Sequence, residues 1–251
     1  MILDKSTVVL IPCAGKGSRS KLPYPKSLFK VKNKTILIKI IEIFNKFNLI
    51  YKIIINKKNF KLFVMESKNY LNRIEFIYQN NPLGMGDAIL QFKKSKNYNE
   101  IKNVILIWGD VPFIKFKTLD ILIKKHFNNK NDFTFISGMS RNPYTIVKRN
   151  KLNKVTSVIE MKNINININI NKNKNKNKIS NYVERDIGVF IFNKKKVINS
   201  LLKIKEKHDS KNEMSFLKVI SVMNSKGLKI EALNIATKQE MKSLNYIKDL
   251  K

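Results

Sequence analysis

The chain is poor in several residue types, and each shortage narrows what the protein can be. It has one cysteine in 251 residues, so no internal disulfide can form and a disulfide-stapled secreted scaffold is excluded. Its two histidines, His126 and His208, stand far apart and in no metal-ligand spacing. No apolar run reaches the roughly 18 residues of a transmembrane helix, and the first residues lack the apolar stretch of a signal peptide. We therefore expect a soluble, cytoplasmic protein with no membrane attachment.

Acidic residues and arginines are also scarce. Eighteen Asp and Glu stand against 50 Lys and Arg, which gives a net charge of +32. Such a balance is typical of nucleic-acid binders, but only five of the cations are arginines, whose planar side chain nucleic-acid recognition favours. Lysine is spread through every segment together with Ile and Asn. We interpret the excess as compositional drift, and we expect no specific nucleic-acid partner beyond weak, sequence-independent adsorption.

Apolar residues make up 43% of the chain, enough to build a core. In the first half, short apolar runs alternate with helical patterns. The predicted strands there are 8–11, 51–55, 74–78, 103–108 and 132–137, and the predicted helices are 35–47, 58–71, 86–94 and 117–127. In the second half, the predicted strands are 144–148, 155–160, 186–192 and 228–233, and the predicted helices are 194–205, 213–223 and 238–250. This alternation predicts an α/β fold with a doubly wound, Rossmann-like, mostly parallel sheet flanked by helices.

One stretch of low complexity interrupts this pattern. Residues 163–178 alternate Asn first with Ile and then with Lys. Alternating lysines repel one another and stay solvated, and surface loops accept insertions at little cost in free energy. We interpret this stretch as a surface insertion; a basic arm that seeks nucleic acid is the alternative.

The densest chemistry follows the first predicted strand, where residues 12–19 read Pro-Cys-Ala-Gly-Lys-Gly-Ser-Arg. A glycine-containing loop after a buried strand brings backbone N–H groups to the carboxyl edge of the sheet, where phosphates bind in open α/β folds. Gly15 and Gly17 allow a sharp turn and a close approach to a phosphate. Three cations lie in or near this loop: Lys16, Arg19 and Lys26. The spacing is neither a Walker A loop nor a GxGxxG dinucleotide fingerprint.

The same spacing, Ala-Gly-x-Gly-Ser/Thr-Arg followed after five residues by Pro-Lys, resembles the signature loop of the sugar-1-phosphate nucleotidyltransferases, a MobA-like superfamily. The chain is most similar there to the uridyltransferase domain of the bacterial N-acetylglucosamine-1-phosphate uridyltransferases. Further segments resemble that domain in the same order: Gln79 with 83–88, 107–114, 158–162, 184–188 and 244–245.

The resemblance implies one nucleotidyltransferase domain over residues 1–251, with a nucleotide-binding half at about 1–140 and a sugar-binding half at about 141–251. It implies transfer of a nucleotide from a nucleoside triphosphate, UTP in the first instance, to a sugar 1-phosphate such as N-acetylglucosamine 1-phosphate, with release of pyrophosphate. The implied cofactor is Mg²⁺. The chain carries no hexapeptide repeats, so we expect it to lack the acetyltransferase half of the bifunctional enzymes.

The resemblance also implies residue roles. Arg19 would bind the β- and γ-phosphates, Lys26 would bind the α-phosphate and the sugar phosphate, and Asp110 with Asn245 would hold the metal. Gln79 and Gly84 would contact the base, and Glu160 would accept hydrogen bonds from sugar hydroxyls. The implied substrate-binding residues are Ala14, Gly15, Lys16, Gly17, Ser18, Gln79, Gly84, Met85, Gly109, Thr145, Glu160 and Asp186.

Three residues depart from the family pattern. Met85 stands where Thr is usual, Thr145 where Gly is common, and Asp186 where the N-acetylglucosamine enzymes carry Asn. Two of these changes fall in the implied sugar pocket, so the resemblance supports nucleotidyl transfer better than it supports a particular sugar. The alternatives are a cytidylyltransferase acting on a polyol phosphate or phosphocholine, a basic nucleic-acid-binding module, and a non-catalytic relative that serves as a binding subunit.

Overall fold

The structure of the chain is a computed structural model. It describes residue 3 and residues 5–15, 17, 20–81, 83–141, 143–161, 182–209 and 212–244. The predicted insertion at 163–178 lies outside the described residues, as does the predicted metal ligand Asn245.

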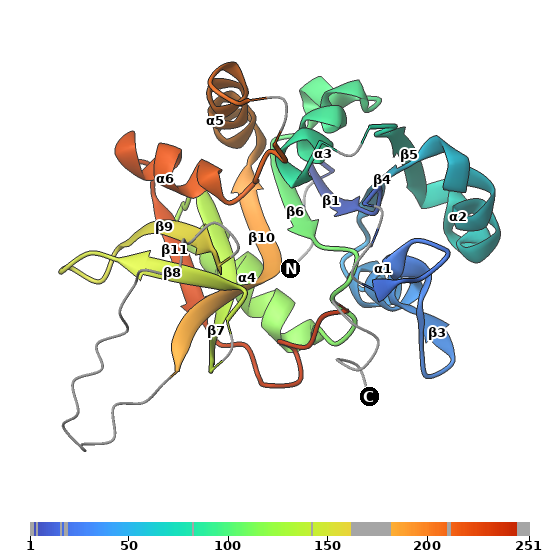
Figure 1. The fold of residues 1–251 in the computed structure, drawn as a ribbon, viewed down its shortest axis with the longest axis horizontal. Helices are drawn as coiled ribbons and strands as arrows, with labels where there is room; N and C mark the ends of the chain where they lie inside the picture. The colour runs from blue at the N-terminus through green and yellow to red at the C-terminus, as the bar shows by residue number, and fades with distance from the viewer. Residues whose placement is uncertain are drawn as a thin grey trace.

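A seven-stranded sheet forms the centre of the molecule, in the order β11–β7–β10–β6–β1–β4–β5 (Figure 1). Strand β10 runs antiparallel to both of its neighbours, and all other neighbouring strands are parallel. The strands are β1 (Thr7–Pro12), β4 (Ile50–Ile55), β5 (Ile74–Tyr78), β6 (Asn103–Ile107), β7 (Phe133–Ser140), β10 (Val183–Asn193) and β11 (Ile230–Asn234). The predicted mostly parallel sheet is confirmed.

Helices cover both faces of this sheet, as predicted for a doubly wound fold (Figure 1). One face carries α1 (Ile36–Asn45), α2 (Phe60–Glu66) and α4 (Phe116–Asn128). The other face carries α3 (Met85–Gln91), α5 (Lys194–Glu206) and α6 (Lys218–Ser225). Successive side chains of a strand point to opposite faces, so Val8 and Leu10 enter one core while Val9 and Ile11 enter the other.

Two smaller antiparallel ribbons accompany the sheet. Strands β8 (Thr145–Arg149) and β9 (Val155–Glu160) pair with each other and confirm the two strands predicted in this region. The pair β2 (Lys30–Val31) and β3 (Lys34–Thr35) was not predicted, because two-residue strands leave no periodic signal in the sequence. Thr35 then begins α1, where its Oγ1 accepts a hydrogen bond from the N–H of Ile38 at 3.3 Å.

Three predicted helices are wrong in extent. The helix predicted over 58–71 is broken, because α2 ends at Glu66 and a 3₁₀ segment, η4 (Lys68–Arg73), follows. Ser67 lies at this break, and its hydroxyl donates to the carbonyl oxygen of Phe63 at 2.7 Å. The helix predicted over 213–223 begins only at Lys218, and the helix predicted over 238–250 is absent from its described part, residues 238–244.

The directions of the strands bring distant segments to one edge of the sheet. Parallel strands β1 and β6 both end there, at Pro12 and Ile107, and antiparallel β10 begins there at Val183. The loops after β1 and β6 therefore lie next to the first residues of β10. Within the described part of the chain, no helix is both long and apolar enough to cross a lipid bilayer.

Candidate active site

The loop after β1 folds back toward Lys26. Gly17 has φ +62°, and a Cβ at this position would lie 3.1 Å from Cγ of Lys26. The carbonyl oxygen of Gly17 accepts two hydrogen bonds from Ser20, from its N–H at 2.9 Å and from its hydroxyl at 2.7 Å. Ala14 is buried and Gly15 is exposed. Three residues predicted to bind phosphates lie outside the described residues: Lys16, Ser18 and Arg19.

Lys26 meets Asp110, although 84 positions separate them. Lys26 begins a 3₁₀ turn, η2 (Lys26–Leu28), and Asp110 follows the end of β6. The Lys26 Nζ lies 4.0 Å from the Asp110 Oδ2, and 14% and 23% of the two side chains are exposed. The predicted phosphate-binding lysine and the predicted metal-binding aspartate are therefore neighbours at the carboxyl edge of the sheet.

Gly109 permits this approach. A Cβ at Gly109 would lie 2.7 Å from the Sγ of Cys13, 3.1 Å from the carbonyl oxygen of Pro12 and 3.4 Å from the Cβ of Ser27. The first contact is too short for carbon and sulfur atoms, so a larger residue would push the loop after β6 away from β1. Cys13 itself is buried, and burial raises the pKa of its thiol to about 12. It is a packing residue.

The chain segment near the carboxyl terminus reaches the same place. The N–H of Leu244 donates to the carbonyl oxygen of Asp110 at 2.9 Å. Three residues earlier, the carbonyl oxygen of Met241 accepts a hydrogen bond from the Arg185 guanidinium of β10. The residue after Leu244 is the predicted metal ligand Asn245, whose own placement is not described.

The segment predicted to bind the base is held by contacts within the chain. Nε2 of Gln79 donates to Oδ2 of Asp87 at 2.7 Å and to the carbonyl oxygen of Gly84 at 3.3 Å. Gly84 has φ +99°, and a Cβ there would lie 2.5 Å from the backbone nitrogen of Met214. Met85 is half-buried against the core. Gly84 is therefore required for the packing of residues 213–214, whatever it contributes to a base.

The predicted sugar-binding residues form a second group. Oδ1 of Asp186 accepts from the Thr145 hydroxyl at 2.5 Å, and Oδ2 accepts from the N–H of Gly188 at 2.9 Å. Burial raises the pKa of Asp186, which is 2% exposed. Glu160 is half-buried, and its Oε1 accepts from the Ser215 hydroxyl at 2.5 Å. Both oxygens of Asp186 are thus engaged within the chain, and it acts on its surroundings mainly by fixing Thr145 and Gly188.

Arg185 joins the two groups, and the sequence reasoning gave it no role. Its charge interacts with both Asp110 and Asp186, and burial lowers the pKa of its guanidinium. One signal was available in the sequence: Arg185 is one of only five arginines among 50 cations. Ser215 was also missed, because a lone serine before a helix gives no functional signal.

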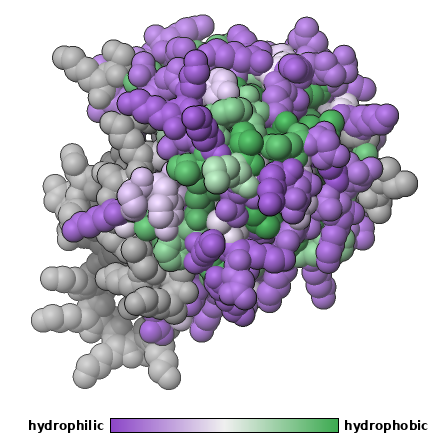
Figure 2. Space-filling view, turned by 90° about the vertical axis from the view of Figure 1, so that its right-hand side faces the viewer, coloured by the Kyte–Doolittle hydropathy of each residue, from purple (hydrophilic) through white to green (hydrophobic). Residues whose placement is uncertain are grey.

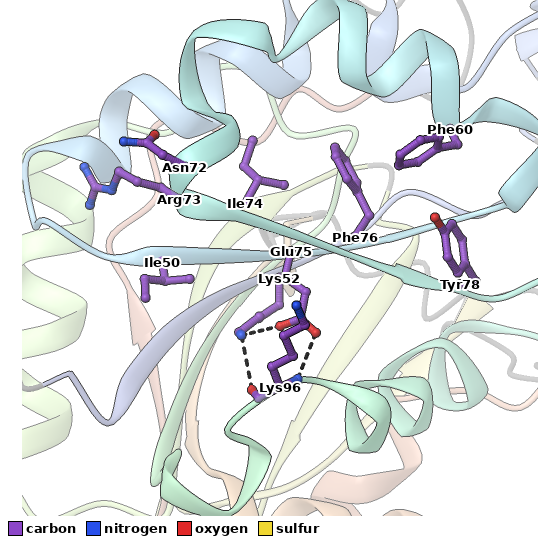
Figure 3. A pocket seen from close by; sticks show the side chains of 10 residues that line it. All are labelled: Ile50, Lys52, Phe60, Asn72, Arg73, Ile74, Glu75, Phe76, Tyr78 and Lys96. Carbon is purple, nitrogen blue, oxygen red and sulfur yellow. Dashed lines mark hydrogen bonds and ion pairs between the residues drawn. The ribbon is translucent and has the colours of Figure 1, made fainter.

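A hollow of about 450 Å³ lies elsewhere, at the open edge of β5 (Figure 3). It is lined by residues of β4, β5 and their neighbours, and by none of the predicted site residues. Three of its lining residues already bond to one another, since Lys52 contacts Glu75 at 2.5 Å and the N–H of Lys96 donates to Glu75 at 2.8 Å. This side of the molecule shows an apolar area surrounded by hydrophilic side chains (Figure 2). The hollow lacks the chemistry of the Lys26 and Asp110 region, which remains the candidate active site.

Comparisons with known proteins agree with the resemblance seen in the sequence, although no protein-family model matches the chain. The bifunctional protein GlmU of Buchnera aphidicola subsp. Schizaphis graminum is 31% identical over 266 aligned residues, which cover 98% of this chain and 52% of GlmU. The chain spans about half the length of the curated relatives it matches.

Two solved structures share the fold. A protein assigned as a glucose-1-phosphate thymidylyltransferase from Bacillus anthracis superposes with a TM-score of 0.67 at 16% identity, covering 92% of this chain and 87% of its own. A 4-diphosphocytidyl-2C-methyl-D-erythritol synthase from Anaerococcus prevotii superposes with a TM-score of 0.65 at 12% identity, covering 97% and 94%. The chain therefore has the fold of the sugar-phosphate type of nucleotidyltransferase. Nearly its whole length is similar to a segment that makes up about half of the length of GlmU.

Proposed function

We propose that the chain is a Mg²⁺-dependent nucleotidyltransferase that converts a nucleoside triphosphate and a sugar 1-phosphate to an NDP-sugar and pyrophosphate. UTP and N-acetylglucosamine 1-phosphate are the leading substrates. The observation that carries this proposal is the contact of Lys26 with Asp110 at 4.0 Å, at the edge of the sheet where β1 ends and the loop after it begins. The similarity to GlmU supports it.

The reaction explains why these residue types stand together. An oxygen of the sugar phosphate attacks the α-phosphorus of the triphosphate, a new P–O bond forms, and the bond to the leaving pyrophosphate breaks. Both reactants are polyanions, so catalysis consists mainly of holding them in line and neutralising their charge. Lys26 supplies a fixed positive charge beside the place where charge grows on the α-phosphate. No protein nucleophile is needed, which agrees with the buried, protonated thiol of Cys13.

The loop after β1 would hold the triphosphate. Backbone N–H groups of a turn that includes a left-handed glycine can converge on an anion, and Gly17 has that conformation. We assign the backbone of Ala14, Gly15 and Gly17 to the leaving pyrophosphate, with Lys16, Ser18 and Arg19 as further ligands.

The donor set suits magnesium. Mg²⁺ takes oxygen ligands and is usually held by one or two carboxylates together with substrate phosphates and water. Asp110 offers a carboxylate, and no group of three His, Cys, Asp or Glu side chains that could hold a metal lies within the described ranges. We propose that Asp110 and Asn245 hold the ion, whose charge would help to neutralise the phosphates.

The acceptor would lie on the side of β8, β9 and β10. Glu160 would accept hydrogen bonds from sugar hydroxyls, and its position is fixed by the hydroxyl of Ser215. Thr145 and Asp186 would shape the pocket through their mutual hydrogen bond. Gln79, Gly84 and Met85 would contact the base.

A cytidylyltransferase acting on another phosphate ester is the second candidate. The fold that the chain shares with the synthase from Anaerococcus prevotii is compatible with it. The two candidates share the loop after β1 and differ in the base and in the acceptor.

Pyrophosphate release measured for four nucleoside triphosphates against several phosphate esters would test the proposal. The panel should include N-acetylglucosamine 1-phosphate, glucose 1-phosphate, a polyol phosphate and phosphocholine, each with Mg²⁺. We expect the highest rate with UTP and a sugar 1-phosphate. Background rates for every pair would contradict the enzyme assignment, and a preference for CTP would select the second candidate.

A further inference from the structure

Arg185 has an N–H group for which the described chain offers no acceptor. The residue is only 9% exposed in β10. Its Nη2 donates to the carbonyl oxygen of Met241, and its Nη1 donates to that of Asp186 at 3.4 Å. Its Nε is buried, and no acceptor for it exists among the described residues. Burying a charged donor without an acceptor costs free energy, so this N–H is suited to an acceptor supplied by a bound molecule.

The charge of Arg185 is also not neutralised by direct contact. Arg149 shows the contrast, because its Nε and Nη2 each donate to an oxygen of Glu184 at 2.8 Å. In the described ranges, no carboxylate oxygen lies within 4.0 Å of the Arg185 guanidinium. The nearby carboxylate of Asp186 is turned to Thr145 and Gly188 instead.

This unneutralised charge lies at the candidate active site. Arg185 interacts electrostatically with Asp110, which is also the carboxylate that lies 4.0 Å from Lys26. Tyr144 packs against the guanidinium with its ring centroid 5.7 Å away and is itself 44% exposed, so Arg185 lies close to the molecular surface. A guanidinium remains charged at physiological pH even where burial lowers its pKa.

We propose that Arg185 binds the phosphate group of the acceptor substrate, with Lys26 as the second cation. This inference rests on the proposed function and adds a residue to it. A guanidinium offers several N–H donors in one plane, which match the oxygens of a phosphate. The acceptor is a better match for Arg185 than the triphosphate is. Arg185 belongs, with Glu160 and Thr145, to the half of the chain that is assigned to the sugar. The Nε–H of Arg185 would then have the acceptor that it lacks among the described residues.

Trp108 provides a direct measurement, since it is the only tryptophan in the sequence and stands two residues before Asp110. Its fluorescence would be followed during titration with inorganic phosphate and with N-acetylglucosamine 1-phosphate, without metal. Arg185→Gln removes the charge and the free N–H. Arg73→Gln is the control, because it removes the same charge at the β5 edge of the sheet. Circular dichroism would show whether each variant is folded.

We expect Arg185→Gln to weaken binding of both probes at least tenfold, and Arg73→Gln to leave binding within twofold of the wild type. Unchanged binding in folded Arg185→Gln, an equal loss in Arg73→Gln, or the absence of phosphate binding by the wild type would overturn the proposal. If Arg185→Gln does not fold, Arg185→Lys decides. A threefold or greater loss supports the proposal, and wild-type affinity overturns it.

The pyrophosphate assay separates this inference from the proposed function. In an active wild type, Arg185→Lys should raise the KM of the acceptor several-fold more than the KM of the triphosphate; equal effects on both would indicate a purely structural role. If the wild type is inactive with every substrate pair but binds phosphate through Arg185, the proposed function fails and the phosphate site stands.

Discussion

Asp110 owes its position to small residues around it. Gly109 leaves no room for a side chain beside Cys13, and the carbonyl oxygen of Asp110 is held by Leu244. The backbone of Asp110 is therefore fixed from both sides, and its carboxylate lies 4.0 Å from Nζ of Lys26. An acidic residue held in this way is suited to bind a cation in a constant geometry.

Replacing Asp110 by Asn tests this view. The change keeps the size of the side chain and removes the negative charge that a metal needs, so we expect pyrophosphate release to fall at least a hundredfold. The backbone contact with Leu244 does not depend on the side chain, so the unfolding free energy should change by less than about 1 kcal/mol. Turnover close to that of the wild type would contradict the metal assignment.

Cys13 leads to a second prediction. Because burial raises its pKa to about 12, almost no thiolate exists at neutral pH, and thiolate is the form that reacts. Native protein at pH 8 should not react with a disulfide reagent over minutes, and unfolded protein should release one equivalent. Fast labelling of the native state would show that the loop after β1 opens readily.

Among the elements, β10 has the largest share in building the site. It spans Val183–Asn193, and its pairing with β7 shifts register between Asp186 and Phe190. Gly188 lies in this irregularity with φ +78°, and a Cβ there would lie 2.7 Å from Cε3 of Trp108. Before this irregularity β10 pairs with β7 alone among the described strands, and after it the strand pairs with both β6 and β7. The first residues of β10 therefore extend beyond the end of β6 toward the site.

Gly188→Ala should therefore be costly. It combines an unfavourable φ with a contact on the Trp108 ring, and we expect a loss of about 2–4 kcal/mol in unfolding free energy. Gly227→Ala is the matched control, since Gly227 has φ +67° and no described atom lies within 4 Å of its Cβ position. It should lose only about 1 kcal/mol. Equal losses in urea unfolding would remove the packing argument for Gly188.

Glu240 holds the carboxyl-terminal segment to the start of α4. Its carboxylate accepts hydrogen bonds from the N–H of Lys115 at 3.1 Å and from the N–H and hydroxyl of Thr237 at 3.0 and 2.8 Å. Burial raises the pKa of Glu240, but these bonds and one from Thr118 lower it more, so the pKa lies below its ordinary value. A carboxylate at the amino end of a helix is also favoured by the helix dipole.

The direction of this shift predicts a pH dependence. Because the pKa is lower in the folded state than in the unfolded state, the stabilisation is complete above the unfolded-state value of about 4.3 and is lost as the pH falls through the folded-state value. At pH 7, Glu240→Gln should be less stable than the wild type by about 1–3 kcal/mol. The difference should shrink as the pH drops below about 4, and a constant difference would contradict the charge argument.

For the whole molecule, the sequence predicted what depends on local pattern. The helical spacing of apolar residues predicted α1 and α4, and the short apolar runs predicted β1 and β6. The alternation of strands with helices predicted the layered α/β fold. The failures have tertiary causes. Residues 213–217 do not form a helix because Met214 bonds by its N–H to Leu83 and by its carbonyl oxygen to Gly86, at 2.8 Å each. No local pattern reveals such a contact.

The candidate site was predictable to a similar degree. Motif spacing identified Lys26 and Asp110, whose contact the structure shows, but it could not indicate that Asp186 bonds within the chain or that Arg185 is buried without a carboxylate partner. Burial and charge neutralisation depend on neighbours from distant segments. The roles of Lys16, Ser18, Arg19 and Asn245 stay predictions.

Deletion of residues 164–178 tests the interpretation of this stretch as a surface insertion in the nucleotidyltransferase domain. The stretch falls between β9 and β10 in the sequence, where we expect a surface insertion, and shortening such an insertion changes the closure entropy only slightly. Pyrophosphate release should stay within a few-fold of the wild-type rate, and the unfolding free energy within about 1 kcal/mol. Complete loss of activity in a folded variant would show that the insertion takes part in function.

The open edge of β5 has a consequence for the behaviour of the protein in concentrated solution. Among the described residues β5 pairs on one side only, and such a strand can join the same strand of another molecule. The neighbouring helix α2 exposes apolar side chains such as Leu62 and Met65. The net charge of +32 keeps molecules apart at low ionic strength. Salt shortens the reach of that repulsion to about 3 Å at 1 M. A purification that raises the salt to strip nucleic acid from this basic chain therefore also removes the barrier to its self-association.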